Sequence, residues 1–211
     1  MEVVICSDEQ QVGQIAANRV LQWVEGLATP VLGLATGSSP LALYNELARR
    51  VAAGEVDFSH GIGFALDEYV GIDPESPLSY RQTILRTVVE PLRMDPARVH
   101  VPNGFAPDLA AAACEYDRAI ATAGGVDVQV LGIGSNGHIG FNEPTSSFAS
   151  RTRVKTLTEQ TRADNARFFD EDERVPTHCV TQGLGTIMEA RHVVMVATGQ
   201  HKADAVAAMV E

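Results

Sequence analysis

Several kinds of residue and segment are scarce in this 211-residue sequence, and each scarcity excludes a class of protein. The 16 Lys and Arg residues are outnumbered by 27 Asp and Glu residues, and the net charge of −11 argues against a surface for nucleic acid or an anionic membrane. No apolar run approaches the roughly 20 residues of a membrane-spanning helix. The start, MEVVICSDEQ, lacks the basic and apolar regions of a signal peptide, so we expect a cytoplasmic protein.

Patterns of metal ligands and of hydrolytic nucleophiles are also lacking. Cys6, Cys114 and Cys179 are widely spaced among apolar residues, which favours reduced thiols over disulfides or a zinc site. The six histidines are scattered, and no H-E-x-x-H segment is present. No serine occupies a G-x-S-x-G turn, so a hydrolase triad is not supported. We therefore expect no bound metal.

What is present begins with a glycine-rich segment, LGIGSNGHIGFNEP at residues 131–144. Gly132, Gly134 and Gly137 have the G-x-G-x-x-G spacing of a dinucleotide-binding turn, which works only where the last glycine opens a helix. Gly140 and Pro144 follow too closely for such a helix. We therefore expect no nicotinamide cofactor, and the segment needs another explanation.

Short apolar segments alternate with segments of helical periodicity along the chain. We expect strands at VVIC (3–6), 31–35, 62–66, 127–133 and 192–198. We expect helices after a capping box at Ser7 and Gln10, after an N-cap at Ser39, and at about 79–92, 107–123, 161–169, 182–190 and 199–211. This alternation predicts an α/β fold with a doubly wound, mostly parallel sheet and helices on both faces, Rossmann-like but without a dinucleotide.

Domain organisation is simple, because the sequence shows no repeats, low-complexity stretch or linker. We expect residues 1–211 to form a single α/β catalytic domain. Because the chain stops at Glu211 inside a helical pattern with no glycine or proline stop signal, we also expect it to lack a C-terminal segment of a longer protein.

Four polar segments follow predicted strands, namely TGSS, DEYVG, GSNGHIGFNEP and TGQHK. In an open α/β sheet, ligands bind outside the carboxyl ends of the strands, so we expect these segments to meet. The TGSS turn lacks the lysine of a Walker A loop, but its backbone N–H groups and hydroxyls suit a phosphate. The alternative is that Ser39 only caps the following helix, and Lys202 in the last segment favours the phosphate.

Two of these segments carry groups that can move protons. Asp67 and Glu68 follow an apolar strand, where a carboxylate either forms a turn or, if partly buried, acts as a general base. His138 titrates near neutrality, and a carboxylate such as Glu143 can set its tautomer. A loop histidine without a role is the alternative, and the flanking glycines favour a functional one.

The longer motifs resemble a known family. LGLATGSSP, FALDEYVGI, GIGSNGHIGFNEP, SRTRVKTLTEQTRADNARFF and VPTHCVTQGLGTI together are similar to the glucosamine-6-phosphate deaminases of the sugar-isomerase type. The resemblance runs from LGLATGSSP to the end of the chain and implies an activity in amino-sugar catabolism. Enzymes of this family convert glucosamine 6-phosphate and water reversibly into fructose 6-phosphate and ammonia, without a metal or an organic cofactor.

The resemblance also implies roles for individual residues. Asp67 matches the base that moves a proton between C2 and C1, His138 the group that opens the sugar ring, and Glu143 the carboxylate that supports it. Asn136 stands where members have Asp or Asn, and an amide can orient His138 without stabilising an imidazolium as a carboxylate does. The implied phosphate site comprises Gly37, Ser38, Ser39, Arg167 and Lys202.

An effector site is implied as well, because some members are hexamers activated by N-acetylglucosamine 6-phosphate at a subunit interface. The resemblance thus extends to a homo-oligomer and to this effector, with Ser146, Arg153, Lys155 and Thr156 as part of the site. The alternative is that Arg153 and Lys155 are exposed charges on a strand.

Two other functions are compatible with parts of the sequence. A 6-phosphogluconolactonase-like hydrolase shares the fold and the handling of a phosphate, but it needs no proton transfer between sugar carbons. A non-catalytic sugar-phosphate sensor needs only the phosphate contacts, so the combination of Asp67, His138 and Glu143 argues against it.

Overall fold

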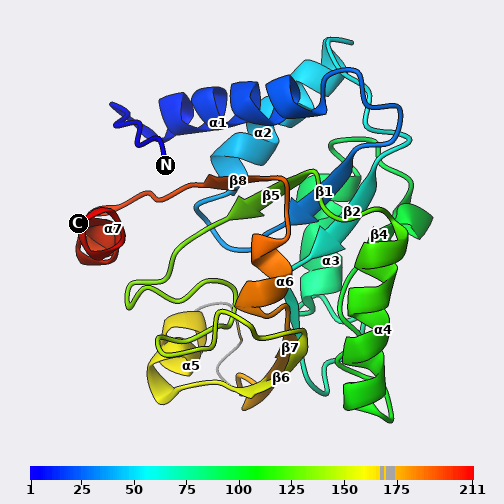
Figure 1. Ribbon diagram of the computed structural model, residues 1–211, viewed down its shortest axis with the longest axis vertical. Coiled ribbons are helices and arrows are strands. Elements are labelled where there is room, and N and C mark those ends of the chain that lie inside the picture. The colour runs from blue at the N-terminus through cyan, green and yellow to red at the C-terminus, as the bar shows by residue number, and fades with distance from the viewer. Residues whose placement is uncertain (167–168, 170–173) are drawn as a thin grey trace.

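Five short strands form the central sheet of the computed structural model, which describes residues 1–166, 169 and 174–211. Their order across the sheet is β4 (Val99–His100), β2 (Ile62–Ala65), β1 (Val31–Leu34), β5 (Val128–Leu131) and β8 (His192–Met195). Every neighbouring pair is parallel. The strands predicted at 31–35, 62–66, 127–133 and 192–198 are confirmed, each a little shorter than predicted (Figure 1).

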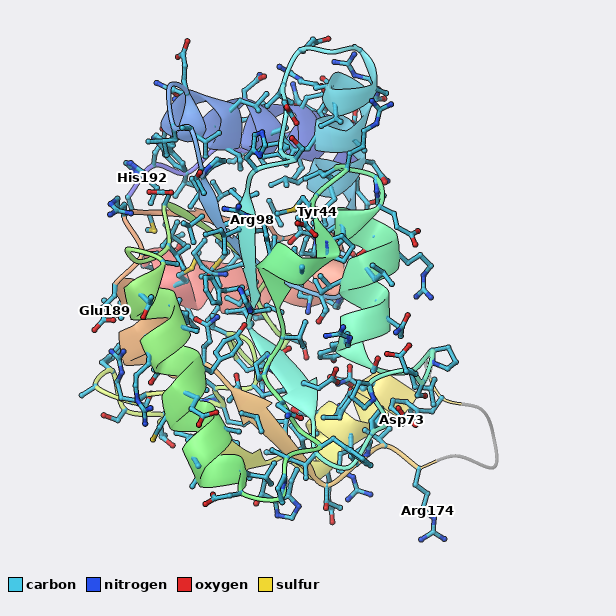
Figure 2. All side chains as sticks on the ribbon, turned by 90° about the vertical axis from the view of Figure 1, so that its right-hand side faces the viewer. Tyr44, Asp73, Arg98, Arg174, Glu189 and His192 are labelled. Carbon is cyan, nitrogen blue, oxygen red and sulfur yellow. The ribbon has the colours of Figure 1, made fainter. Side chains whose placement is uncertain are left out.

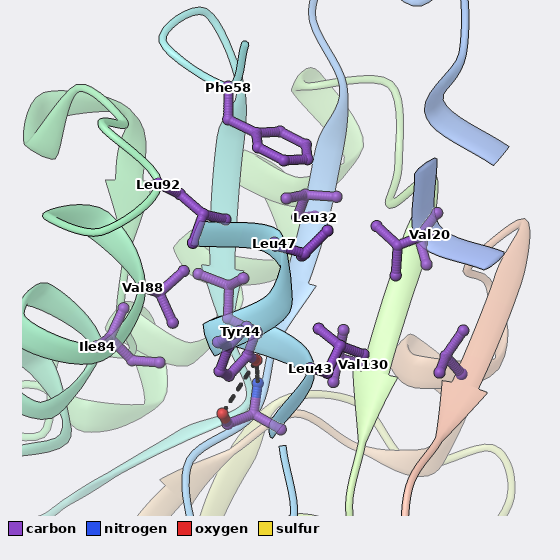
Figure 3. Packing of buried hydrophobic residues seen from close by; sticks show 14 of the residues in the cluster. Val20, Leu32, Leu43, Tyr44, Leu47, Phe58, Ile84, Val88, Leu92 and Val130 are labelled. Atoms are coloured by element: carbon purple, nitrogen blue, oxygen red, sulfur yellow. Dashed lines mark hydrogen bonds between the residues drawn. The ribbon is translucent and has the colours of Figure 1, made fainter. Parts of the chain in front are cut away.

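Helices cover both faces of this sheet, because alternate strand residues point to opposite sides. Leu32 and Leu34 pack in one cluster with α1 (Glu9–Val24), α2 (Leu41–Ala52) and the segment formed by α3 (Tyr80–Ile84) and a π-helical turn at Leu85–Val89. Figure 3 shows this packing. Val31 and Phe64 pack on the other face against α4 (Leu109–Thr122). The predicted doubly wound α/β fold is confirmed.

A second, smaller sheet was not expected from the sequence. Its three antiparallel strands lie in the order β3 (Asp67–Tyr69), β7 (His178–Thr181) and β6 (Arg153–Thr156). The remaining elements are short helices at Pro96–Arg98, α5 (Glu159–Asn165), α6 (Leu184–Met188), Gln200–Lys202 and α7 (Ala203–Val210). None of the helices in the described part of the chain is long and apolar enough to cross a membrane.

Two predictions at the N-terminus are wrong. VVIC is not a strand: Val3, Val4 and Ile5 are exposed, and Glu2 forms an ion pair with Arg19 that holds this segment along α1, away from the sheet (Figure 1). The helix is capped by Asp8 rather than Ser7, with the Asp8 carboxylate accepting a hydrogen bond from the backbone N–H of Gln11. A carboxylate is the stronger acceptor, and it moves the cap one residue along.

Glu68 fixes the junction between the two sheets. Its carboxylate is buried and accepts hydrogen bonds from the backbone N–H groups of Tyr69 at 2.8 Å, Tyr80 at 3.0 Å and Arg81 at 3.0 Å. Burial raises the pKa of Glu68, and these hydrogen bonds partly oppose the rise. Glu68 therefore ties β3 to the first turn of α3. By contrast, Asp73 and Glu189, which Figure 2 labels, are exposed.

We predict that Glu68→Gln destabilises the protein. The amide replaces one acceptor oxygen with a donor, so at least one buried N–H group loses its partner at a cost of about 1–3 kcal/mol. Urea unfolding monitored by circular dichroism measures the loss. Glu90→Gln, a change at an exposed carboxylate that follows the helical turn at Leu85–Val89, is the matched control. Equal stability of the two variants would show that the carboxylate does not hold this junction.

Candidate active site

A cavity of about 420 Å³ opens at the carboxyl ends of β1, β2 and β5. It is lined by segments that the sequence separates widely: the loop after β1, the start of β3, the α3 segment, the glycine-rich loop after β5, and the turn before α7. The predicted site residues among its lining are Gly37, Ser38, Ser39, Asp67, His138 and Lys202. The expected meeting of polar segments at this edge of the sheet therefore occurs.

Tyr44 of α2 holds the start of the loop after β1 by two hydrogen bonds. The buried Tyr44 hydroxyl accepts a hydrogen bond from the backbone N–H of Ala35 at 2.9 Å and donates one to the Ala35 carbonyl at 3.1 Å (Figure 3). Gly37 then adopts a φ of 95°, which glycine permits without strain. These contacts fix the TGSS turn beside the cavity.

Ser39 does not cap the following helix, contrary to the sequence prediction. The helix begins at Leu41 with Pro40 in the N-cap position, and no side chain makes a capping hydrogen bond. The reason is that the turn is closed by backbone groups, with the N–H of Leu41 donating to the carbonyl of Ser38. Ser39 is buried and lines the cavity, so the alternative of simple capping is removed.

Asp67 is held rigidly by hydrogen bonds on both sides of its backbone. The Ala65 carbonyl accepts from the Tyr116 hydroxyl at 2.7 Å and from the Gln182 amide at 2.9 Å. The Leu66 carbonyl accepts from the backbone N–H of Gln182, and Asp67 itself pairs with Thr181 in the small sheet. The side chain at this junction is therefore placed by β2, α4 and β7 together.

The Asp67 carboxyl is buried, with 5 % of its surface exposed. Among the described residues, none donates a hydrogen bond to it, in contrast to the neighbouring Glu68. Burial, together with the adjacent charge of Glu68, raises the pKa of Asp67 to about 8. A carboxyl group with such a pKa releases and takes up a proton near neutral pH, as a general base requires.

The glycines of the residue 131–144 segment make room for these groups. A Cβ atom at Gly134 would lie 2.3 Å from the His138 ring, and one at Gly140 would lie 3.2 Å from the Asp67 carboxylate. Gly137 and Gly140 also have positive φ angles. The G-x-G-x-x-G spacing thus belongs to a turn that seats His138 and lets the loop approach Asp67.

His138, Asn136 and Glu143 form a hydrogen-bonded chain. His138 Nδ1 lies 2.7 Å from Asn136 Oδ1, and Asn136 Nδ2 donates to Glu143 Oε2 at 2.8 Å. Since the amide donates through its nitrogen to Glu143, its oxygen must accept, and His138 therefore carries its proton on Nδ1. The Nε2 atom is then left with a lone pair. The hydrogen bonds connect Glu143 to the ring through Asn136.

Burial and neighbouring groups shift the pKa values of His138 and Glu143. Burial lowers the pKa of His138, Glu143 and Asp164 oppose this, and Lys202 adds to it. Burial alone would raise the pKa of Glu143, but hydrogen bonds from Thr161, Asn136 and Thr158 hold the pKa below its ordinary value. Neither Asn136 nor Glu143 is among the described residues that line the cavity.

The cations of the site are only partly those expected. Lys202 lines the cavity together with the TGSS turn, whereas Arg167 lies outside the described residues. Arg86 also lines the cavity and was missed. The signal was present, because Thr83, Arg86 and Thr87 are polar residues spaced to share one face of the predicted helix at 79–92.

The residues of the expected effector site lie apart from the cavity lining. Arg153, Lys155 and Thr156 belong to β6, and Ser146 follows Glu143 in the loop before it. Arg153 and Lys155 lie on the same face of the strand, since they are two residues apart. In the described part of the chain, no group of three or more His, Cys, Asp or Glu residues could hold a metal ion.

Comparisons with known proteins agree with this geometry. The family model described as glucosamine-6-phosphate isomerases/6-phosphogluconolactonase matches residues 7–211. The glucosamine-6-phosphate deaminase of Cutibacterium acnes is 61% identical over the whole chain, which covers 81% of that protein. The protein of the same name from Mycolicibacterium smegmatis is 53% identical, again over the whole chain and 81% of the relative.

Two solved structures share the fold of this chain but differ in how similar their sequences are to it. A monomeric glucosamine-6-phosphate deaminase superposes with a TM-score of 0.96 at 38% identity, covering 100% of this chain and 87% of that one. The 6-phosphogluconolactonase of Leishmania guyanensis reaches a TM-score of 0.74 at 20% identity, covering 99% and 85%, which shows the shared fold alone. The chain therefore belongs to the glucosamine-6-phosphate isomerase/6-phosphogluconolactonase family.

Proposed function

We propose that the protein is a glucosamine-6-phosphate deaminase, which converts glucosamine 6-phosphate and water reversibly into fructose 6-phosphate and ammonia. The observation that carries this proposal is the buried Asp67 carboxyl in the same cavity as His138 and the TGSS turn. Relatives of that name that match the whole chain at 53–61% identity support it. The lactonase alternative rests on the fold alone, since the solved structures of that name are 16–20% identical.

The phosphate of the substrate binds at the TGSS turn. Backbone N–H groups and hydroxyls of Gly37, Ser38 and Ser39 supply donors, and Lys202 supplies the charge. Arg86 adds a second cation from the α3 segment. Anchoring the phosphate fixes the sugar carbons relative to Asp67 and His138, which replaces an encounter in solution with a positioned reaction.

Ring opening is the task of His138. The Nε2 atom accepts a proton from the anomeric hydroxyl, and the same group returns a proton to the ring oxygen as the C1–O5 bond breaks. A neutral imidazole suits this exchange, and burial keeps the pKa of His138 low enough for the neutral form.

Asp67 then acts on the open sugar. Its carboxylate removes the proton from C2 while O1 gains a proton, which gives an enolamine. The carboxyl group then delivers its proton to C1 while the nitrogen loses one, which leaves a CH2OH group at C1 and an imine at C2. Water adds to C2, and ammonia leaves as the C2–N bond breaks and the ketose forms. The burial of Asp67 suits the proton transfer, because the resulting pKa of about 8 lies near the pH at which the enzyme works.

The organisation of the chain and its regulation are further parts of the proposal. Both sheets contribute to one cavity, which supports residues 1–211 acting as one α/β catalytic domain. An N-acetylglucosamine 6-phosphate site at Ser146, Arg153, Lys155 and Thr156 of a homo-oligomer stays a prediction. Activity assays with and without this compound, together with sedimentation, test it.

We predict that Asp67→Asn abolishes proton transfer while sugar-phosphate binding survives, because the amide keeps the shape and removes the basic lone pair. The protein is incubated with fructose 6-phosphate and ammonium in deuterated water, and deuterium at C2 of glucosamine 6-phosphate is measured by NMR. We expect wild-type protein and the exposed-site control Asp73→Asn to incorporate deuterium. In Asp67→Asn the rate should fall by about 10²–10⁴. Normal incorporation there would exclude Asp67 as the base, and no incorporation by wild-type protein would exclude the deaminase.

The same variant should be more stable than wild-type protein in alkaline solution. The folded protein holds a proton on Asp67 up to about pH 8, whereas the unfolded chain releases it near the ordinary aspartate pKa of 3.8. Wild-type stability therefore falls as the pH rises between these values, and Asp67→Asn escapes this loss. We expect its advantage in the free energy of unfolding to grow to roughly 2–5 kcal/mol by pH 9. Urea unfolding across this pH range measures it, and an advantage independent of pH would contradict the raised pKa.

Removing the Lys202 charge should weaken binding of substrate and product alike. Loss of a charged hydrogen bond to phosphate costs about 1.5–3 kcal/mol. Calorimetric titration of fructose 6-phosphate into Lys202→Ala measures the loss. Lys155→Ala is the matched control, since Lys155 is the other lysine of the sequence and is not among the described residues lining the cavity. Wild-type affinity in Lys202→Ala would remove this residue from the phosphate site.

A further inference from the structure

Two threonines of the segment that begins α5 hold the Glu143 carboxylate. The Thr161 hydroxyl donates to Glu143 Oε1 at 2.5 Å, and the Thr158 hydroxyl lies 3.1 Å from the same oxygen. Thr158 is also the N-cap of α5 and accepts a hydrogen bond from the backbone N–H of Thr161. Thr161 is 2 % exposed, so water cannot readily take its place beside Glu143. One oxygen of Glu143 is therefore fixed from α5.

The other oxygen of Glu143 faces the proton-transfer chain. Glu143 Oε2 accepts from Asn136 Nδ2, and Asn136 Oδ1 lies against His138 Nδ1. Asn136 is exposed, so water competes for both ends of its amide. The backbone N–H of His138 also donates to Asn136 Oδ1, at 3.1 Å, so the amide is held at both ends. The position of Glu143 decides whether the amide nitrogen keeps its acceptor.

We propose that Thr161 is a positioning residue for His138, acting through Glu143 and Asn136 to keep the His138 proton on Nδ1 and the Nε2 lone pair available for ring opening. The catalytic part of this inference rests on the proposed function, whereas the effect on the imidazole does not. The order of contacts is Thr161 to Glu143, Glu143 to Asn136, and Asn136 to His138.

Removal of the Thr161 hydroxyl affects each of the hydrogen bonds that lead from Thr161 to His138. Without Thr161 as a donor, Glu143 Oε1 is left partly buried without its shortest hydrogen bond, and the carboxylate turns toward water. Asn136 Nδ2 then loses its fixed acceptor, and the backbone N–H of His138 alone still holds the amide oxygen. With one restraint instead of two, the amide turns more readily, so the second neutral tautomer of His138 becomes populated.

Thr161 also connects this chain to the cavity wall. It lies on α5 together with Asn165, which lines the cavity. The helix that contributes to the binding surface is thus the one that holds Glu143.

The test compares Thr161→Val, which keeps the shape and removes the hydroxyl, with Thr161→Ser, which restores it. The matched control is Thr152→Val, because Thr152 is a buried threonine whose hydroxyl donates to Asp117 at 2.5 Å, outside this chain of contacts. The ring-nitrogen chemical shifts of His138 in ¹⁵N-labelled, ligand-free protein report the tautomer, and His138→Gln identifies the signals. Circular dichroism confirms that each variant is folded, and Thr161→Ala replaces Thr161→Val if the latter does not fold.

We expect the Nδ1–H tautomer in wild-type protein, Thr161→Ser and Thr152→Val, and a mixture of both tautomers in Thr161→Val. Unchanged His138 shifts in Thr161→Val, or equal changes in Thr152→Val, would overturn the proposal. This readout needs no turnover, so it stands even if the proposed reaction is wrong.

Steady-state kinetics with glucosamine 6-phosphate supply the second readout. Because the substrate contacts remain, we expect an almost unchanged KM and a kcat about tenfold lower in Thr161→Val, a part of the 10²–10⁴ that general acid–base catalysis contributes. Thr161→Ser should recover most of the rate. A rise in KM with unchanged kcat would assign Thr161 to binding and contradict a positioning role.

Discussion

The burial of two consecutive carboxyl groups, Asp67 and Glu68, is the constraint on which the rest of the structure depends. Side chains of successive strand residues point to opposite sides. The adjacent residues Asp67 and Glu68 therefore place one carboxyl group on each side of β3. Glu68 receives three backbone N–H groups and becomes part of the framework. Asp67 receives none from the described residues and stays reactive. This rigid framework keeps the Asp67 carboxyl buried, although burial is unfavourable for its charged form.

The site contains two carboxylates whose environments push their pKa values in opposite directions. Burial raises the pKa of Asp67, whereas hydroxyl and amide donors overcome the effect of burial at Glu143 and lower its pKa. Such separation is the usual way in which one site provides both a group that exchanges protons and a group that stays charged. Asn136 between Glu143 and His138 keeps the charge one step away from the ring, so the imidazole is oriented more than it is electrostatically stabilised.

Much of the large sheet and of the cavity could be predicted from the sequence, because both follow from local patterns. Four apolar strands and the polar segments after them are visible in short windows, and parallel strands bring those segments together. The small sheet could not be predicted in this way. Its strands DEY, RVKT and HCVT are short and mostly polar, and they pair across long stretches of chain. Asp67 was consequently placed at the end of one strand, whereas it begins another.

The small sheet also affects the order in which the molecule can assemble. Its central strand, β7, comes late in the chain and ends with Thr181, which pairs with Asp67. The next residue, Gln182, supplies the groups that hold Ala65 and Leu66. Pairings between such distant segments form slowly, after local helices and hairpins. During synthesis, the Asp67 carboxyl therefore remains an ordinary, hydrated acid until β7 has emerged and docked. The raised pKa of Asp67 therefore depends on a segment far downstream in the sequence, so a chain in which β7 has not docked does not carry an active base.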